Sequence, residues 1–274
     1  MASENYKGYP EPSHVVSVEE AARLLEDDGV VFVDTRNYWV YAKGHIPGAL
    51  NLELYAFHWY DTSREGLETF AMEMARLLGS YGIDRKKQVV FYENRSGYDA
   101  ARGVWLLDFL GNPRGRMLDG GLNLWMRKGH GVSKTDPKIR RARFTPKLDF
   151  GAVCGLDELS ESRGAGDLQV VDARSRGEYD GTFRRALRGG HVPGSVNIEW
   201  KKALRRDGSL KDAGQLLALY SGLSPSGGVV TYCQSGFRAS HTWLVLRLLG
   251  FNGARNYLGS WYEWGNHPST QVVS

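Results

Sequence analysis

Two stretches of the chain decide its fold because they repeat one another: residues 89–111 read VVFYENRSGYDAARGVWLLDFLG, and residues 229–250 read VVTYCQSGFRASHTWLVLRLLG. In both stretches a short apolar run rich in β-branched residues precedes a polar loop, and a segment with helical periodicity follows. The pattern therefore predicts a buried strand, a loop and a helix in each copy.

The repeat extends beyond these stretches on both sides. Three further pairs of segments match in the same order: VVFVDTR at 30–36 with QVVDAR at 169–174, GHIPGALN at 44–51 with GHVPGSVN at 190–197, and DGGL at 119–122 with LGSW at 258–261. A period of more than a hundred residues is too long for a solenoid. The sequence therefore indicates a tandem duplication of a domain of ~130 residues.

The segment 133–150 has no counterpart in either copy, and it is polar and basic. We interpret it as a linker between a first domain at residues 1–132 and a second domain at residues 151–274. Strands alternate with helices in each copy, and an N-terminal helix is predicted from a Ser17 cap to about Asp27. This order predicts an α/β fold in which each domain is a mostly parallel sheet flanked by helices.

Composition excludes several classes of protein. The 274 residues include only two cysteines, which is too few for a disulfide framework or a zinc site built on several thiolates. No apolar run is long enough to span a membrane, and no basic stripe with interleaved aromatics predicts nucleic-acid binding. The net charge of +4 fits a small anionic substrate, and the polar N-terminus without an apolar signal region leads us to expect a cytoplasmic protein.

Cys233 is the predicted nucleophile because it directly follows a strand, where ligands bind to parallel sheets. A loop between a strand and a helix can curl its N–H groups around an anion, and Gly236 permits the left-handed conformation that this requires. A free thiol with an ordinary pKa is only ~3% thiolate at pH 7, and lowering that pKa by ~1.5 units makes it half thiolate. The rest of the predicted active-site loop is Gln234, Ser235, Gly236, Phe237 and Arg238.

The first copy provides an internal comparison. Glu93 stands where the second copy has Cys233, so we expect the first domain to be catalytically inactive. Cys154 aligns with Val16, an apolar position, and is predicted to be structural. Arg238 aligns with Asp99, and this difference indicates a cation that binds an anionic donor and the thiolate.

These motifs resemble those of the tandem-domain rhodanese family, the sulfurtransferases that include thiosulfate and 3-mercaptopyruvate sulfurtransferases. The resemblance covers nearly the whole chain. It implies that Cys233 becomes a persulfide, which takes sulfane sulfur from a small anionic donor. The acceptor is then cyanide, a thiol or a thioredoxin-like protein, and no cofactor is implied. The matching motifs are Asp34/Arg36, Asp172/Arg174, both Gly-His-x-Pro-Gly boxes, the Cys233 loop, and Gly259-Ser260-Trp261 with Trp264.

Family members often place an arginine for the donor's anionic group at the position of Glu178. Since Glu178 has the opposite charge, either a neighbouring arginine binds the donor or the donor differs. The predicted substrate-binding residues are Arg238, Arg174, Arg176, Arg184, Arg185 and Arg188. Arg174 also occurs as Arg36 in the inactive copy, so a structural ion pair with Asp172 is expected as well.

Two further pairs of residues are assigned from their places in the sequence. His45 and His191 occur in both copies and are interpreted as turn and packing residues, with no metal site. Tyr38 and Trp39 are candidates for the cleft between the domains or for ordinary packing at its interface.

Three other functions remain as alternatives. A 3-mercaptopyruvate sulfurtransferase is the first, because Gln234-Ser235-Gly236 has elements of that family's loop, whereas the charge of Arg238 favours thiosulfate. A sulfur carrier without turnover is the second. The third is a phosphatase or arsenate reductase of the same fold, but these enzymes need Cys-x5-Arg, and Ala239 stands at that position.

Overall fold

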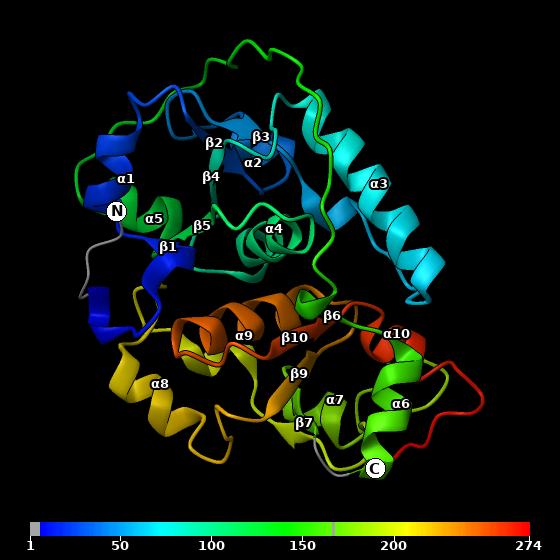
Figure 1. Ribbon diagram of the computed structural model, residues 1–274. Coiled ribbons are helices and arrows are strands. Elements are labelled where there is room, and N and C mark those ends of the chain that lie inside the picture. Colours follow the sequence, from blue (N-terminus) through cyan, green and yellow to red (C-terminus); the bar gives the residue numbers. More distant parts are fainter. Residues whose placement is uncertain (1–5, 166–167) are drawn as a thin grey trace.

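Two parallel sheets, one in each half of the chain, form the centres of the molecule. The computed structural model describes residues 6–165 and 168–274, and Figure 1 shows the two halves one above the other. In the first sheet the strand order is β1-β5-β4-β2-β3, and in the second it is β6-β10-β9-β7-β8. All strand pairings are parallel, so the two sheets have the same topology and the predicted α/β class is confirmed.

The strands agree closely with the apolar runs of the sequence. The first sheet consists of β1 (Val15–Val16), β2 (Val30–Asp34), β3 (Leu50–Asn51), β4 (Gln88–Tyr92) and β5 (Gly115–Leu118). The second consists of β6 (Val153–Cys154), β7 (Leu168–Asp172), β8 (Val196–Asn197), β9 (Gly228–Tyr232) and β10 (Ala254–Tyr257). The central strands β4 and β9 are buried along most of their length because helices cover both faces of each sheet.

Helices follow the strands in both halves. Those of the first half are α1 (Val18–Leu24), α2 (Tyr38–Tyr41), α3 (Arg64–Ser80), α4 (Tyr98–Phe109) and α5 (Gly121–Arg127). Those of the second are α6 (Leu156–Ala165), α7 (Arg176–Tyr179), α8 (Ala213–Leu219), α9 (Phe237–Leu248) and α10 (Ser260–Trp264). Ser17 caps α1 as predicted by accepting the N–H of Glu20, but the helix ends at Leu24 rather than near Asp27.

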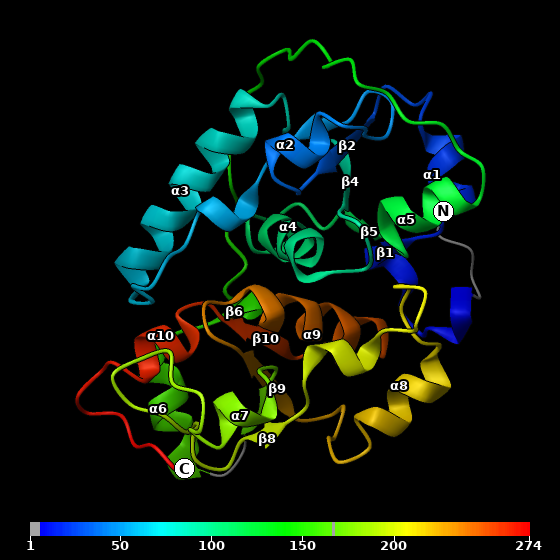
Figure 2. The ribbon, with the colours of Figure 1, turned by 180° about the vertical axis from the view of Figure 1, so that it is seen from behind.

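Helices α4 and α9 form the centre of the contact between the halves. Figures 1 and 2, which view the molecule from opposite sides, show the two helices next to each other at the middle, between the two sheets. Most residues of both helices are buried, and one apolar cluster includes Trp105 of α4 together with Trp243 of α9. The Trp105 indole also donates a hydrogen bond of 2.8 Å to the carbonyl of Ala152 in the second half. The site described below lies next to this interface.

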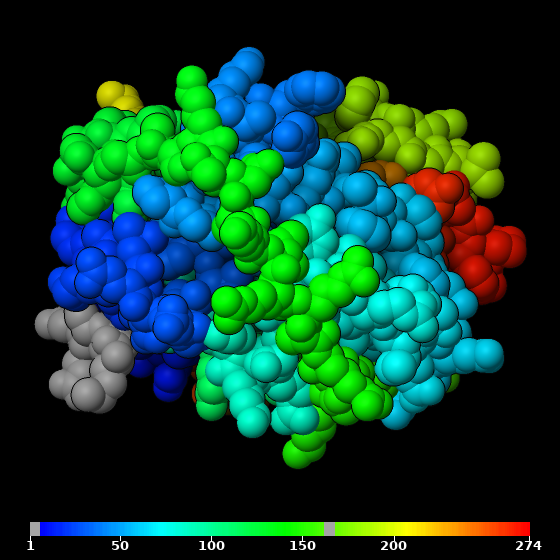
Figure 3. Space-filling view, turned by 90° about the horizontal axis from the view of Figure 1, so that it is seen from above, coloured from blue at the N-terminus to red at the C-terminus, as the bar shows by residue number. Residues whose placement is uncertain are grey.

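Segments outside the regular elements also connect the halves. Near the N-terminus the N–H of Glu11 donates to the carbonyl of Leu248, so this part of the predicted first domain lies against the second. The predicted linker 133–150 crosses the first domain, where Phe144 is buried, and Figure 3 shows it in green across that face. Among the described residues, no helix is both long enough and apolar enough to cross a membrane.

Candidate active site

Cys233 lies at the carboxyl end of β9, the middle strand of the second sheet. Its side chain is only 1% exposed, and the three residues after it complete the loop before α9 begins at Phe237. Gly236 is the N-cap of α9, with a φ of 79° that a residue without Cβ adopts at no cost. The first N–H groups of a helix have no intrahelical acceptor, so this end of α9 favours negative charge beside the loop.

Ser260 tethers the loop from the neighbouring strand end. Its hydroxyl accepts the N–H of Cys233 at 3.1 Å and the N–H of Gly236 at 3.0 Å, and it donates to the carbonyl of Tyr257 at 2.8 Å. Ser260 has a φ of 53°, which is unusual for a residue with a Cβ. Gly121 has nearly the same φ of 56° at the aligned position of the first copy. Sequence reasoning gave Ser260 no role, although this exchange of Gly for Ser between the copies was the available signal.

Glu178 is the ion-pair partner of Arg238. The guanidinium donates to Glu178 Oε2 at 2.7 Å and to Oε1 at 2.9 Å, and Glu178 also accepts the hydroxyl of Ser175. Burial by itself raises the pKa of Glu178, but the hydrogen bonds from Arg238 and Ser175 together lower it to about 2. Arg238 was predicted to bind the donor and the thiolate; in the structure its guanidinium pairs with Glu178 at the edge of the cavity. Burial lowers the pKa of Arg238, but the hydrogen bonds with Glu178 and the charge of Cys233 raise it above its usual value, so the Cys233 sulfur also lies within its electrostatic reach.

A cavity of about 430 Å³ opens above Cys233. Both halves of the molecule contribute to it, since Tyr55, Arg95 and Tyr98 come from the first half. The remaining lining residues are Ser175, Glu178, Arg185, Glu199, Trp200, Lys201, Cys233, Gln234, Ser235, Phe237 and Arg238. Arg95, Arg185 and Lys201 are exposed cations at this cavity, and sequence reasoning missed Arg95 and Lys201 because no local motif marks them.

The six arginines that were predicted to bind substrate differ in whether they line this cavity. Arg238 and Arg185 line the cavity, whereas the other four do not. Arg174 is buried, pairs with Asp172 at 2.6 Å and donates to the carbonyl of Gly190, so its role is structural. Arg176 pairs with Asp180, Arg184 is exposed to solvent, and Arg188 donates to backbone carbonyls near the C-terminus. A short basic segment does not show which of its side chains point into a cavity, so the sequence could not separate these six arginines.

The remaining predicted residues lie away from the cavity. Tyr38 and Trp39 are 50% and 77% exposed on α2, and neither lines the Cys233 cavity. His45 stacks on Tyr41 and His191 on Tyr179, and the Nδ1 atom of each histidine lies within hydrogen-bond distance of that tyrosine's carbonyl. No group of three or more His, Cys, Asp or Glu that could bind a metal gathers within residues 6–165 and 168–274.

The corresponding loop of the first half has different chemistry. Glu93 takes the place of Cys233, and its carboxylate accepts the N–H of Asp99 at 3.1 Å. Burial raises the pKa of both carboxyl groups, and for Asp99 the nearby Glu93 raises it further. Cys154 is fully buried in β6, and burial raises its pKa far above the ordinary value, as an unreactive thiol requires.

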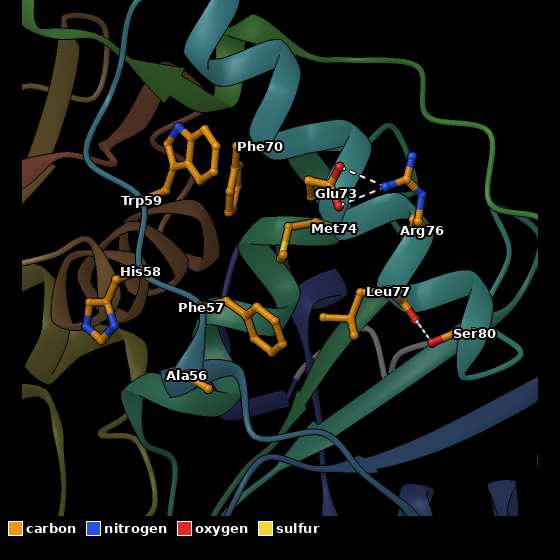
Figure 4. A pocket seen from close by; sticks show the side chains of 10 residues that line it. All are labelled: Ala56, Phe57, His58, Trp59, Phe70, Glu73, Met74, Arg76, Leu77 and Ser80. Atoms are coloured by element: carbon orange, nitrogen blue, oxygen red, sulfur yellow. Dashed lines mark hydrogen bonds and ion pairs between the residues drawn. The ribbon is translucent and has the colours of Figure 1, made fainter.

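A second cavity of about 550 Å³ lies in the first half beside α3. Figure 4 shows Phe57, Met74 and Leu77 directed into it, with the ion pair between Glu73 and Arg76 at one side. It contains no cysteine, and its lining is mainly apolar. We therefore place the candidate active site at the Cys233 cavity.

Comparisons with known proteins agree with this architecture. The family model "Rhodanese-like domain" matches residues 17–128 and again residues 155–267. The thiosulfate sulfurtransferase of Azotobacter vinelandii is 35% identical over 94% of this chain and 96% of its own length. The sulfur carrier protein TtuD of Thermus thermophilus is 34% identical, with the same coverage of both chains.

Solved structures show the same fold. SseA from Escherichia coli, described as a 3-mercaptopyruvate sulfotransferase, superposes with a TM-score of 0.77 at 26% identity, over 92% of this chain and all of that one. The anaerobic ergothioneine biosynthesis enzyme from Chlorobium limicola superposes with a TM-score of 0.85 at 22% identity, over 97% of this chain and 71% of that one. The chain therefore belongs to the rhodanese-like family, as a sulfurtransferase with two tandem domains.

Proposed function

We propose that Cys233 transfers sulfane sulfur from thiosulfate to a thiophilic acceptor through a persulfide. The observation that carries this proposal is the position of the thiol, which lies at a helix N-terminus on the floor of a cavity with several cations. Among the described residues, it is the one cysteine that lines this cavity. A helix N-terminus and nearby cations both stabilise a thiolate, which is the reactive form of cysteine.

The reaction has two displacement steps. The Cys233 thiolate attacks the outer sulfur of thiosulfate, so a new S–S bond forms while the S–S bond of the donor breaks and sulfite leaves with the electron pair. In the second step the acceptor attacks the outer sulfur of the persulfide and restores the thiolate. With cyanide as acceptor the product is thiocyanate, and a small thiol or a thioredoxin-like protein takes the sulfur in the same way.

The charges at the cavity support thiosulfate as the donor. Glu178 does not repel an anion strongly, because Arg238 neutralises it. Arg185 and Lys201 form only long ion pairs, at 4.0 Å with Glu178 and 3.8 Å with Glu199, and like Arg95 they are exposed, so these three cations can attract a sulfonate group. The Arg238–Glu178 pair also argues against a phosphatase, which needs its loop arginine for the phosphoryl group. The relatives from Azotobacter vinelandii and Corynebacterium glutamicum are named thiosulfate sulfurtransferases, and this agrees with the proposed donor.

Two alternative functions are each supported by the similarity to one known protein. The similarity to SseA, a 3-mercaptopyruvate sulfotransferase by its description, favours 3-mercaptopyruvate, whose carboxylate the same cations would attract. The name of the Thermus thermophilus relative favours a sulfur carrier, which forms the persulfide but passes its sulfur on only to a particular partner. Both assignments use the same Cys233 persulfide, so one experiment can separate them.

Intact mass spectrometry tests the proposal directly. After incubation with thiosulfate we expect the protein to gain roughly 32 Da, the mass of one sulfur atom, and to lose it again on addition of cyanide. Cys233→Ser should show no gain and no thiocyanate formation. If the protein gains this mass with mercaptopyruvate but not with thiosulfate, the donor is 3-mercaptopyruvate rather than thiosulfate. If the persulfide forms but cyanide does not remove its sulfur, the result favours the function of a sulfur carrier.

Cys154→Ser is the matched control because it removes the other thiol. The buried position of Cys154 in β6 leads us to expect turnover within about threefold of the wild type. A variant Cys233→Ser that still produced thiocyanate, or a Cys154→Ser variant that lost nearly all activity, would contradict the assignment.

A further inference from the structure

Arg102 is a buried cation in the first domain that the proposed chemistry has not used. It is the fifth residue of α4, and its side chain is only 2% exposed. Neither Nη1 nor Nη2 has a hydrogen-bond partner in the part of the chain that the structure describes. A buried charge without a partner is strongly destabilising, so a role for this guanidinium is expected.

The guanidinium of Arg102 packs behind the catalytic loop of the other domain. A Cβ atom added to Gly236 would lie 3.2 Å from Nη1, which places the charge against the backbone of that loop. The centre of the guanidinium is 5.0 Å from the ring of Phe237 and 4.4 Å from the ring of Trp105. These aromatic rings exclude water from the charge and keep the local dielectric low.

The same position of the second domain makes a reciprocal contact. His241 is the fifth residue of α9, and its Nε2 lies 3.1 Å from the carbonyl of Ser96 in the loop after β4. Burial lowers the pKa of His241 to about 4, so this side chain is neutral at pH 7. Each central helix thus supports the loop of the opposite domain, but only the loop with Cys233 receives a positive charge.

We infer that Arg102 is a positioning residue that stabilises the anionic sulfur of Cys233 through the catalytic loop. This inference rests on the proposed function, and it assigns the inactive domain an electrostatic role in catalysis. Burial lowers the pKa of Arg102 to about 9, and the charge of Cys233 acts in the opposite direction, as expected if this sulfur is its counterion. The other charged groups at the cavity are Arg95, Glu178, Arg185, Glu199, Lys201 and Arg238.

The test is the pH dependence of iodoacetamide alkylation of Cys233 in the reduced protein, without any donor. In Arg102→Met we expect the midpoint of the profile to rise by about one pH unit, which corresponds to about fivefold slower alkylation at pH 7 for a thiol that is half ionised there, and to about tenfold at a pH well below the midpoint. Arg102→Lys keeps the charge and should recover most of the wild-type profile. Arg116→Met is the matched control, since Arg116 is also buried in the first domain but pairs with Glu20 at 2.6 Å.

An alkylation profile of Arg102→Met that coincides with that of Arg116→Met would overturn the inference. A shift of equal size in Arg102→Lys would overturn it as well, because loss of packing rather than of charge would then be responsible. If Arg102→Met does not fold, Arg102→Gln replaces it, with the same expected shift. Failure of the proposed function is distinguishable, because the wild-type protein would then gain no sulfur from thiosulfate in the parallel mass measurement.

Discussion

The role of Glu178 could be interpreted only from the folded protein, which shows the partner of its carboxylate. Its negative charge stands where a donor-binding arginine was expected, but its carboxylate lies within 2.9 Å of both terminal nitrogens of Arg238. A positive charge in the first turn of α9 interacts unfavourably with the helix dipole, and the negative charge of Glu178 offsets this effect for Arg238. The arginine is therefore part of the wall of the cavity, where Arg95, Arg185 and Lys201 are exposed.

The ion pair predicts a change of stability in acid. The pKa of Glu178 is about 2 in the folded protein and 4.5 in the unfolded chain, so the carboxylate stabilises the fold above pH 4.5 by about 3 kcal/mol. This stabilisation is lost as the pH falls from 4.5 to 2. In urea unfolding, the difference in free energy between wild type and Glu178→Gln should shrink by about 2 kcal/mol from pH 7 to pH 3. A constant difference would contradict this prediction.

At the scale of elements, one strand–loop–helix unit occurs in two forms. In the first form five residues connect β4 to α4, and in the second form four residues connect β9 to α9. Cys233 follows β9 directly, as Glu93 follows β4, so the two forms differ in the residues after this position. In the second form Ser260, the first residue of α10, accepts the N–H groups of Cys233 and Gly236. The aligned Gly121 shows that the backbone of this turn is the same in both copies, so the hydroxyl of Ser260 is the added feature.

Ser260 therefore combines a useful hydroxyl with an unfavourable backbone conformation. Ser260→Ala leaves two buried N–H groups without an acceptor and should destabilise the protein by about 1–3 kcal/mol. Ser260→Gly loses the same hydrogen bonds but relieves the positive φ, so it should be more stable than Ser260→Ala by about 1 kcal/mol. Guanidinium unfolding of both variants gives this order, and the reverse order would show that the turn is not strained.

At the scale of the whole molecule, the two domains share one apolar cluster. It extends from Phe70 and Trp105 in the first half to Trp243 and Leu246 in the second. Outside this cluster, Thr62 donates to Glu263 through its hydroxyl at 2.6 Å and its N–H at 3.1 Å. The interface thus resembles the core of a single domain more than the polar contact between independent ones.

Shared burial predicts that the two domains unfold together. Scanning calorimetry should show one transition, with a calorimetric enthalpy close to the van't Hoff enthalpy. Two separate transitions, or an enthalpy ratio near two, would contradict this prediction and indicate that the domains are independently stable.

Most of the fold could be predicted from the sequence, because it follows from local patterns. Short-range periodicity predicts the alternation of strands and helices, including the strand and the helix on either side of the Cys233 loop. The same pattern occurs in both halves of the sequence, so the duplication could be predicted as well. The candidate nucleophile could be predicted for the same reason, since Cys233 and Glu93 occupy matching positions after matching strands. The end of α1 was misplaced because the termini of short helices depend on tertiary contacts.

The sequence by itself determined the family, the two copies and the one cysteine at a strand end. The tertiary structure decided which charges surround that cysteine: it paired Arg238 with Glu178, buried Arg174, and brought Arg95 and Arg102 from the first domain to the cavity and to the back of the loop. The physical reason is that hydrophobic periodicity is a local property of the chain. Coulomb interactions, by contrast, depend on distances between side chains that lie far apart in sequence and meet only when the domains pack.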